Sequence, residues 1–182
     1  HFRHMADYQA RLSFALSQGA PVRDVLVIHP LTTAWCTFDP NQAPARPWSD
    51  KTEQFQTLLG HLLGLHRDFD LGDETVLARV GRVEDGALIV SQARYRLVIV
   101  PVVQNLESST ADLLEQFVAA GGHILWLFGR PASENGAMRR VVPAWVDGRP
   151  SDRLRRLIEH PRVHAAAAHR ADLADLLDRL LP

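Results

Sequence analysis

The sequence is poor in residues that cross-link a chain, bind zinc or anchor a protein in a membrane. Cys36 is the only cysteine, which excludes an internal disulfide and a cysteine-based zinc cluster. We expect it to be a small buried thiol, because free cysteine packs much like an apolar residue. Apolar runs are only a few residues long, too short to span a bilayer. The first residues also lack the basic-then-apolar pattern of a signal peptide, so we expect a cytoplasmic protein and no membrane partner.

Lysine is almost missing as well. Lys51 is the only lysine among 20 basic residues, and the others are arginines spread along the chain. So uniform a bias indicates a GC-rich coding genome more than a recognition surface. Acidic and basic residues are mixed, the formal net charge is -1, and no basic stripe is present. A nucleic-acid partner is therefore not expected.

Length and composition fit one domain preceded by a helix. The chain has 182 residues, of which 46% are hydrophobic, enough for one independent core. Apolar residues from Phe2 to Leu16 keep roughly helical spacing and predict a helix over 3–18. This helix begins without a start methionine, which predicts a segment of a longer protein. We expect residues 1–20 to be a lead-in helix from a preceding domain and residues 21–182 to be a single α/β domain.

The first strand is expected directly after this helix. Val25–Ile28 is a fully apolar run bounded by Asp24 and Pro30, as in a strand buried on both faces of a parallel sheet. Three prolines argue against a regular helix or central strand over 31–49, so we expect a long loop there. Asp50 is suited to cap the helix that follows.

Helical patterns and short apolar runs alternate along the rest of the chain. The expected strands are 69–71, 87–91, 95–101, 123–129 and a weak one near Val163, and the expected helices are 50–65, 73–78, 109–120 and 172–181. Strands alternating with helices imply right-handed βαβ crossovers. The sequence therefore predicts an α/β fold with a doubly wound, mostly parallel sheet.

Polar residues are expected at one edge of this sheet. Ligands of such folds bind at the carboxyl ends of the strands, near the point where the strand order reverses. These ends carry His29 and the segments 32–35, 70–74, 101–105 and 129–130. Every sheet of this class has a polar edge, so the pattern indicates a rim and does not identify a ligand.

The loop after the first strand does not fit a phosphate-bearing cofactor. A dinucleotide site needs glycines there, so that the backbone can approach the pyrophosphate. This loop has none, and Pro30 removes an amide donor. A flavin site would use a loop rich in Ser and Thr, for which Thr32 and Thr33 are too little. We therefore expect no cofactor.

Nucleophilic catalysis has little support in the sequence. Cys36 lies between Trp35 and Thr37, without the flanking glycines of a tight nucleophile turn. No G-x-S-x-G elbow occurs either.

The stretch from His66 to Glu74 is the densest group of acids. Asp70, Asp73 and Glu74 can offer oxygen ligands to a hard cation, or a carboxylate pair for glycoside hydrolysis. Acids at a helix start are also expected from capping and the helix dipole alone. His61 and His66 are five residues apart and do not share a helix face. We expect no metal site, and nothing in the sequence identifies an acid with its catalytic partner.

The tryptophans divide into core and surface candidates. Trp126 lies inside an apolar strand, so we expect its side chain to be in the core. Trp35 and Trp48 lie in the proline-rich segment, where an aromatic side chain can stack on a ligand such as a sugar.

Three stretches of the sequence resemble a known family. They are "HMADYQARLSFALSQGAPVRDVLVIHPLTTAW", "HRDFDLGDE" and "YRLVIVPVVQNLESSTADLLEQFVAAGGHILWL", and together they cover roughly residues 4 to 128. They resemble the domain that follows the catalytic barrel in large bacterial glycoside hydrolases, including α-L-rhamnosidase-like enzymes and, more distantly, family 42 β-galactosidases. In the latter it is called the trimerisation domain, and its fold is similar to flavodoxin and class I glutamine amidotransferases.

The resemblance implies a supporting role in carbohydrate metabolism. The catalytic carboxylates of that family belong to the barrel, so no catalytic residue is carried over to this chain. The implied partners are a catalytic barrel domain of the same chain, further subunits in a homo-oligomer, and carbohydrate bound by the parent enzyme. The candidates for the edge of the sugar pocket or for an interface are His29, Trp35, Asp70, Asp73 and Glu74.

An alternative hypothesis treats the chain as a free-standing enzyme. It would be an amidotransferase-like enzyme acting on a small molecule, using Cys36 or the acids Asp70, Asp73 and Glu74. A third hypothesis is an oligomerisation module in which the apolar residues of the lead-in helix form the interface.

Overall fold

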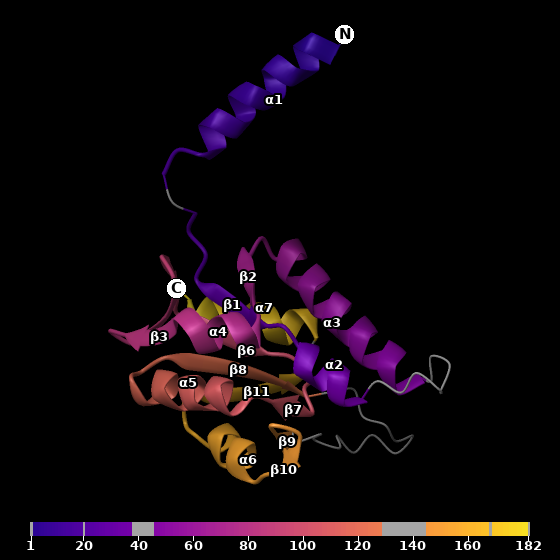
Figure 1. Ribbon diagram of the computed structural model, residues 1–182, viewed down its shortest axis with the longest axis vertical. Coiled ribbons are helices and arrows are strands. Elements are labelled where there is room, and N and C mark those ends of the chain that lie inside the picture. The colour runs from indigo at the N-terminus through magenta and orange to yellow at the C-terminus, as the bar shows by residue number, and fades with distance from the viewer. Residues whose placement is uncertain (1, 20, 38–45, 129–144, 168, 182) are drawn as a thin grey trace.

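The protein has a central sheet of five parallel strands (Figure 1). The computed structural model describes residues 2–19, 21–37, 46–128, 145–167 and 169–181. The strands are β1 (Val25–Ile28), β2 (Phe69–Gly72), β6 (Leu97–Val100), β8 (His123–Phe128) and β11 (Val163–Ala167). They lie in the order β11-β8-β6-β1-β2, and every neighbouring pair is parallel. This is the strand order of flavodoxin-like folds, so the predicted doubly wound α/β fold is confirmed.

Side chains of the central strands alternate between two apolar cores. Leu26, Ile28, Val98 and Val100 belong to one cluster, whereas their neighbours along the same strands belong to the other. All residues of β1 and β6 are buried, because successive side chains point to opposite faces and both faces are covered. Because both faces of these strands are buried, their sequences are apolar throughout and do not alternate between apolar and polar residues.

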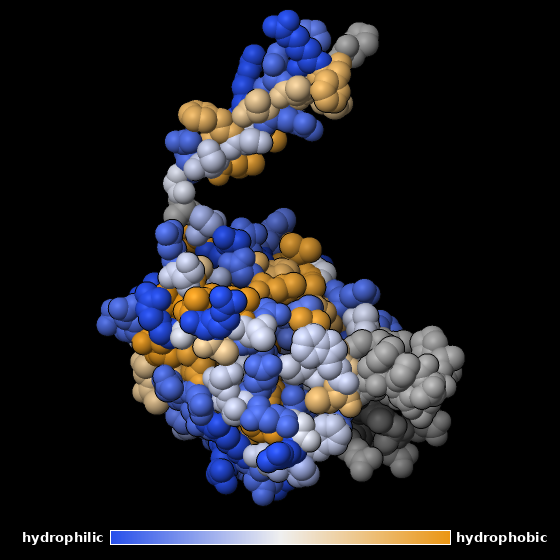
Figure 2. All heavy atoms as spheres, viewed as in Figure 1, coloured by the Kyte–Doolittle hydropathy of each residue, from blue (hydrophilic) through white to orange (hydrophobic). Residues whose placement is uncertain are grey.

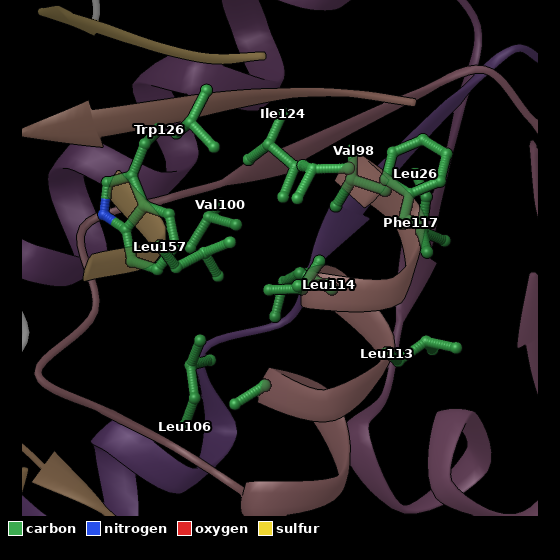
Figure 3. Close-up of a cluster of buried hydrophobic side chains, with 14 of the residues drawn as sticks. Leu26, Val98, Val100, Leu106, Leu113, Leu114, Phe117, Ile124, Trp126 and Leu157 are labelled. Atoms are coloured by element: carbon green, nitrogen blue, oxygen red, sulfur yellow. The ribbon is translucent and has the colours of Figure 1, made fainter. Parts of the chain in front are cut away.

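Helices cover the two faces separately. On one face the strands pack against α4 (Glu74–Val80), α5 (Ser108–Ala119) and α6 (Arg153–Ile158), and on the other against α3 (Arg46–Gly64) and α7 (Arg170–Leu180). Figure 3 shows the first core, in which Phe117 and Leu114 of α5 point towards Leu26, Val98 and Ile124 of the sheet. The predicted core residue Trp126 is buried there.

Two small sheets complete the described fold. One contains β3 (Gly81–Glu84), β4 (Ala87–Val90) and β5 (Ala93–Tyr95), and the other contains β7 (Asn105–Leu106), β9 (Trp145–Val146) and β10 (Arg149–Pro150). Two-residue turns connect β3 to β4 and β9 to β10. Each is an Asp-Gly pair with both φ angles positive, the combination that favours a type I′ hairpin. The expected strand 87–91 therefore lies outside the central sheet.

Residues 31–37 and 46–49 contradict the prediction of a long loop over 31–49. Leu31–Thr37 forms helix α2, and α3 begins at Arg46 instead of Asp50. Proline is unfavourable inside a helix but is tolerated at its first turn. Pro30 precedes α2, with its carbonyl accepting from the Ala34 amide at 3.0 Å, and Pro47 is the second residue of α3. These two prolines therefore mark helix starts, whereas Pro40 and Pro44 lie outside the described residues.

The lead-in helix α1 (Phe2–Leu16) stands away from the sheet and its covering helices (Figure 1). None of its residues is buried. Figure 2 shows apolar side chains along its length. Within the described part of the chain, no helix combines the length and apolarity needed to cross a membrane.

Gly122 offers a sharp test of packing in the first core. A Cβ atom at this position would lie 2.2 Å from Cε2 of Phe117, whose side chain is fully buried. We expect Gly122→Ala to lower the free energy of unfolding by about 1–3 kcal/mol, the usual cost of overpacking. Gly60 of α3 has no atom within 4 Å of its Cβ position, so Gly60→Ala should raise stability by about 0.5–1 kcal/mol. Urea unfolding measures both, and equal effects of the two changes would contradict this account.

Two histidines make the folded state sensitive to acid. His123 of β8 and His164 of β11 stack with ring centroids 5.3 Å apart, and Nδ1 of His123 lies 3.0 Å from Nε2 of His164. Burial lowers the pKa of both imidazoles, with further lowering of the His123 pKa by Arg162 and of the His164 pKa by His123 and Arg179. The folded state therefore favours the neutral forms.

The direction of the pH dependence follows from these lowered pKa values. An unfolded histidine has a pKa of about 6.5, so stability is fully present above that pH and is lost as the pH falls through the folded-state pKa. We expect urea unfolding to show decreasing stability between about pH 7 and about pH 5. His164→Gln should remove part of this decrease. His4→Gln, on the exposed face of α1, should leave it unchanged, and an undiminished decrease in His164→Gln would refute the assignment.

Candidate functional site

The strand order reverses between β1 and β6, and the chain leaves both strands at the same edge of the sheet. From β1 the chain runs on to edge strand β2, whereas β6 leads to β8 on the other side. His29 follows β1 and Pro101 follows β6. Crevices at such switch points are the usual ligand sites of open α/β sheets. The switch point therefore lies beside His29 and Pro101, two positions that the sequence analysis expected at the rim.

A cavity of about 390 Å³ lies at this point. Its wall is built from the start of α2, the first turns of α3 and the segment after β6. His29 and Phe55 both line it and pack against each other, with ring centroids 5.6 Å apart and a tilt of 45°. Trp35 also lines it and is 68% exposed. The cavity is thus mostly apolar and aromatic, with few polar groups.

Lys51 supplies the positive charge of the cavity. Its Nζ donates a hydrogen bond to Oε1 of Gln104 at 3.1 Å. Burial lowers the pKa of this amine, because the charged form loses contact with water. No ion pair joins Lys51 to a carboxylate in the described part of the chain. The ammonium is therefore only partly compensated.

Thr33, which lines the cavity, has a buried hydroxyl that bonds to the backbone after β6. Oγ1 of Thr33 accepts from the backbone amides of Gln104 and Asn105, each at 3.0 Å, and donates to the Asn105 carbonyl at 2.9 Å. Oδ1 of Asn105 in turn accepts from the Gly148 amide at 2.8 Å. These bonds join α2, the segment after β6 and the β9–β10 hairpin.

Glu74 belongs to this polar framework and not to the cavity wall. Its carboxylate accepts from the Thr32 hydroxyl and, at 2.8 Å, from the Glu107 amide. Only 3% of its surface is exposed, and burial raises its pKa, against the opposing effect of those two hydrogen bonds. Glu74 therefore ties α2 and α4 to the start of α5.

The other two predicted acids have separate structural partners. Asp73 is the N-cap of α4 and accepts from the Val76 amide at 3.1 Å and from the Thr75 hydroxyl, which lowers its pKa. Asp70 of β2 pairs with Arg23 and accepts from the Tyr95 hydroxyl at 2.8 Å. Burial and then this hydrogen bond raise the pKa of Tyr95.

The structure thus separates the five predicted site residues. His29 and Trp35 meet at the cavity, whereas Asp70, Asp73 and Glu74 are not among the residues that line it. Over the described ranges, no group of three or more His, Cys, Asp and Glu side chains is placed to hold a metal ion.

Cys36 corrects one sequence prediction. It was expected to be buried, but the thiol is exposed because α2 turns this residue outwards. The side chain of Trp48 and residues 129–130 lie outside what the structure describes.

The sequence interpretation missed the cavity residues Lys51 and Phe55, whereas Val102 lies in the expected rim segment 101–105. The uniqueness of the lysine was visible, but its neighbours were not, because Gln104 lies 53 residues away along the chain.

Comparisons with known proteins do not assign this chain to a family. No protein-family model matches this sequence, and no curated protein matches it either. The resemblance to domains of glycoside hydrolases therefore stays a prediction.

The role of Thr33 can be tested through stability. Thr33→Val would leave the amides of Gln104 and Asn105 without their buried acceptor, and we expect a loss of about 1–3 kcal/mol. Thr52→Val is the matched control, since Thr52 lines the same cavity but is exposed, and it should change stability by less than about 0.5 kcal/mol. Urea unfolding measures the stability of both variants. A Thr33→Val protein as stable as Thr52→Val would contradict the structural role of the Thr33 hydroxyl.

Proposed function

We propose that this chain is a non-catalytic accessory domain of a carbohydrate-active glycoside hydrolase. In this proposal α1 packs on the catalytic barrel of the same protein, and the cavity at the switch point borders the sugar pocket. The observation that carries the proposal is the bare apolar surface of α1.

The apolar residues of α1 form one stripe along the helix. Phe2, Met5, Tyr8, Leu12 and Leu16 follow one another at intervals of three or four residues, and each is exposed. An isolated helix of this length is marginal in water, and most helical stability in proteins comes from packing of an apolar face. Exposed apolar patches of this kind mark interaction sites. A neighbouring domain is the occupant that we propose.

The acids of the chain support a non-catalytic role. A glycosidase needs two carboxyl groups facing the scissile bond. Here Asp70 is held by Arg23 and Tyr95, Asp73 caps a helix, and Glu74 is buried. None of these three lines the cavity, where Trp35 is the side chain best suited to touch a sugar.

Hydrolysis of aryl glycosides by the chain itself tests the absence of catalysis. We expect no turnover above that of buffer, because the barrel would supply both carboxylates. Reproducible turnover that disappears in Asp70→Asn or Asp73→Asn would contradict the proposal. Hydrolysis of an amide such as glutamine that disappears in Cys36→Ser would instead favour the amidotransferase-like alternative.

A separate test asks whether a preceding domain covers the apolar stripe of α1. A barrel-sized coding stretch in frame upstream of His1 in the source genome is expected, and an immediate in-frame stop codon would oppose the proposal. Light scattering tests whether a second copy of the chain covers α1 instead. A homo-oligomer that dissociates in Leu12→Glu but persists in the neighbouring Arg11→Glu would assign the stripe to such a copy.

A further inference from the structure

We propose that the cavity at the switch point binds a small carboxylate with a single-ring body. Lys51 would hold the carboxylate through its ammonium group, and Trp35 and Phe55 would hold the ring. The inference concerns the ligand of the cavity, and it does not depend on the accessory role of the domain.

The charge of the cavity favours an anion. Its described lining contains one ammonium, Lys51, and one imidazole, His29, but no acidic side chain. A partly buried charge is costly unless a counter-charge or hydrogen bonds compensate it. The ammonium has three donors, of which one goes to the neutral amide of Gln104. A ligand carboxylate would supply both the missing charge and further acceptors.

Size and shape narrow the ligand class. A volume of about 390 Å³ corresponds to about a dozen water molecules at roughly 30 Å³ each, which suits one ring with a carboxylate. Apolar side chains of Leu31, Phe55 and Val102 contribute to the wall, and the exposed indole of Trp35 offers a flat face at the same cavity. Rings stack on such faces, whereas the ammonium fixes the orientation of the ligand.

The cationic group is also held in position before any ligand arrives. Gln104, which accepts from Lys51, donates its own backbone amide to the buried hydroxyl of Thr33. Thr33 in turn belongs to α2, which contributes Trp35 to the cavity. Preorganised groups lose less entropy on binding, so this support favours a ligand site over an incidental hollow.

Calorimetric titration of the full chain tests the proposal with two matched pairs of probes. Benzoate and benzamide share a flat ring, and glucuronate and glucuronamide share a sugar ring, so each pair differs in charge. We expect at least one of the two carboxylates to bind about tenfold or more tightly than its amide, since hydrogen bonds between charged groups are the strong ones. Binding of glucuronate alone would assign a sugar acid, and binding of benzoate alone an aryl acid.

Substitutions locate the binding. Lys51→Met should weaken the carboxylate about tenfold or more, whereas Lys51→Arg should retain most of the affinity because it keeps the charge. Arg94→Gln removes an exposed cation that lines a different pocket and should have no effect. Equal affinity for both members of both pairs, or equal affinities of Lys51→Met and Arg94→Gln, would overturn the proposal.

A second readout does not depend on any variant folding. Because Lys51 is the only lysine, reductive methylation with ¹³C-formaldehyde labels one side-chain amine, apart from the chain terminus. We expect the carboxylate to shift this NMR signal and to raise the pKa of the amine, because an anion stabilises its charged form. A signal unmoved by saturating benzoate and glucuronate would refute the site. Such a failure would leave the accessory role of α1 untouched.

Discussion

The fold depends on burying both faces of five short parallel strands. Each residue of β1 must be apolar, because Val25 and Val27 enter one core while Leu26 and Ile28 enter the other. A sheet of this kind is stable only when helices cover both sides. That requirement dictates the crossovers and, through the strand order, the crevice beside His29. The cavity is thus a consequence of how the apolar strands are covered.

A polar framework then fixes the crevice in one arrangement. Thr32, Thr33, Glu74 and Asn105 are all buried, and each has hydrogen-bond partners from another element. Buried polar groups are costly when unpaired and rigid when fully paired. The same hydrogen bonds that satisfy the interior therefore position Gln104, and through it Lys51. Stability and the chemistry of the cavity share one set of contacts.

The sequence predicted the parts of the fold whose pattern reports burial directly. Val25–Ile28 and Leu97–Val100 are apolar throughout because they are buried on both faces, and this signal is local. It predicted Leu31–Thr37 wrongly, because Pro40, Pro44 and Pro47 all follow this segment and do not forbid a helix within it. The exposure of Cys36 was missed because the apolar character of a free thiol does not show which way its helix turns it.

The partners of the three neighbouring acids could not be predicted from the sequence, for a different physical reason. Asp70, Asp73 and Glu74 are close in sequence, but the strand ends and the helix begins between them. Their side chains therefore meet partners as far apart in the chain as Arg23 and Glu107. The spacing of residues in the sequence cannot show pairing between positions so far apart. For the same reason, the sequence did not show that Gln104 lies beside Lys51.

The position of β1 in the middle of the sheet also affects how the chain folds during synthesis. β1 is the first strand of the central sheet to be synthesised. Its two neighbours, β2 and β6, are complete only once Gly72 and Val100 have been added. At about 5–20 residues per second, its apolar side chains wait on the order of 4–14 s for the second neighbour. The edge strand β11 follows later still, so β8 keeps an open edge until Ala167 has been made. The nascent chain therefore needs shielding from other copies of itself, and most of all along β1.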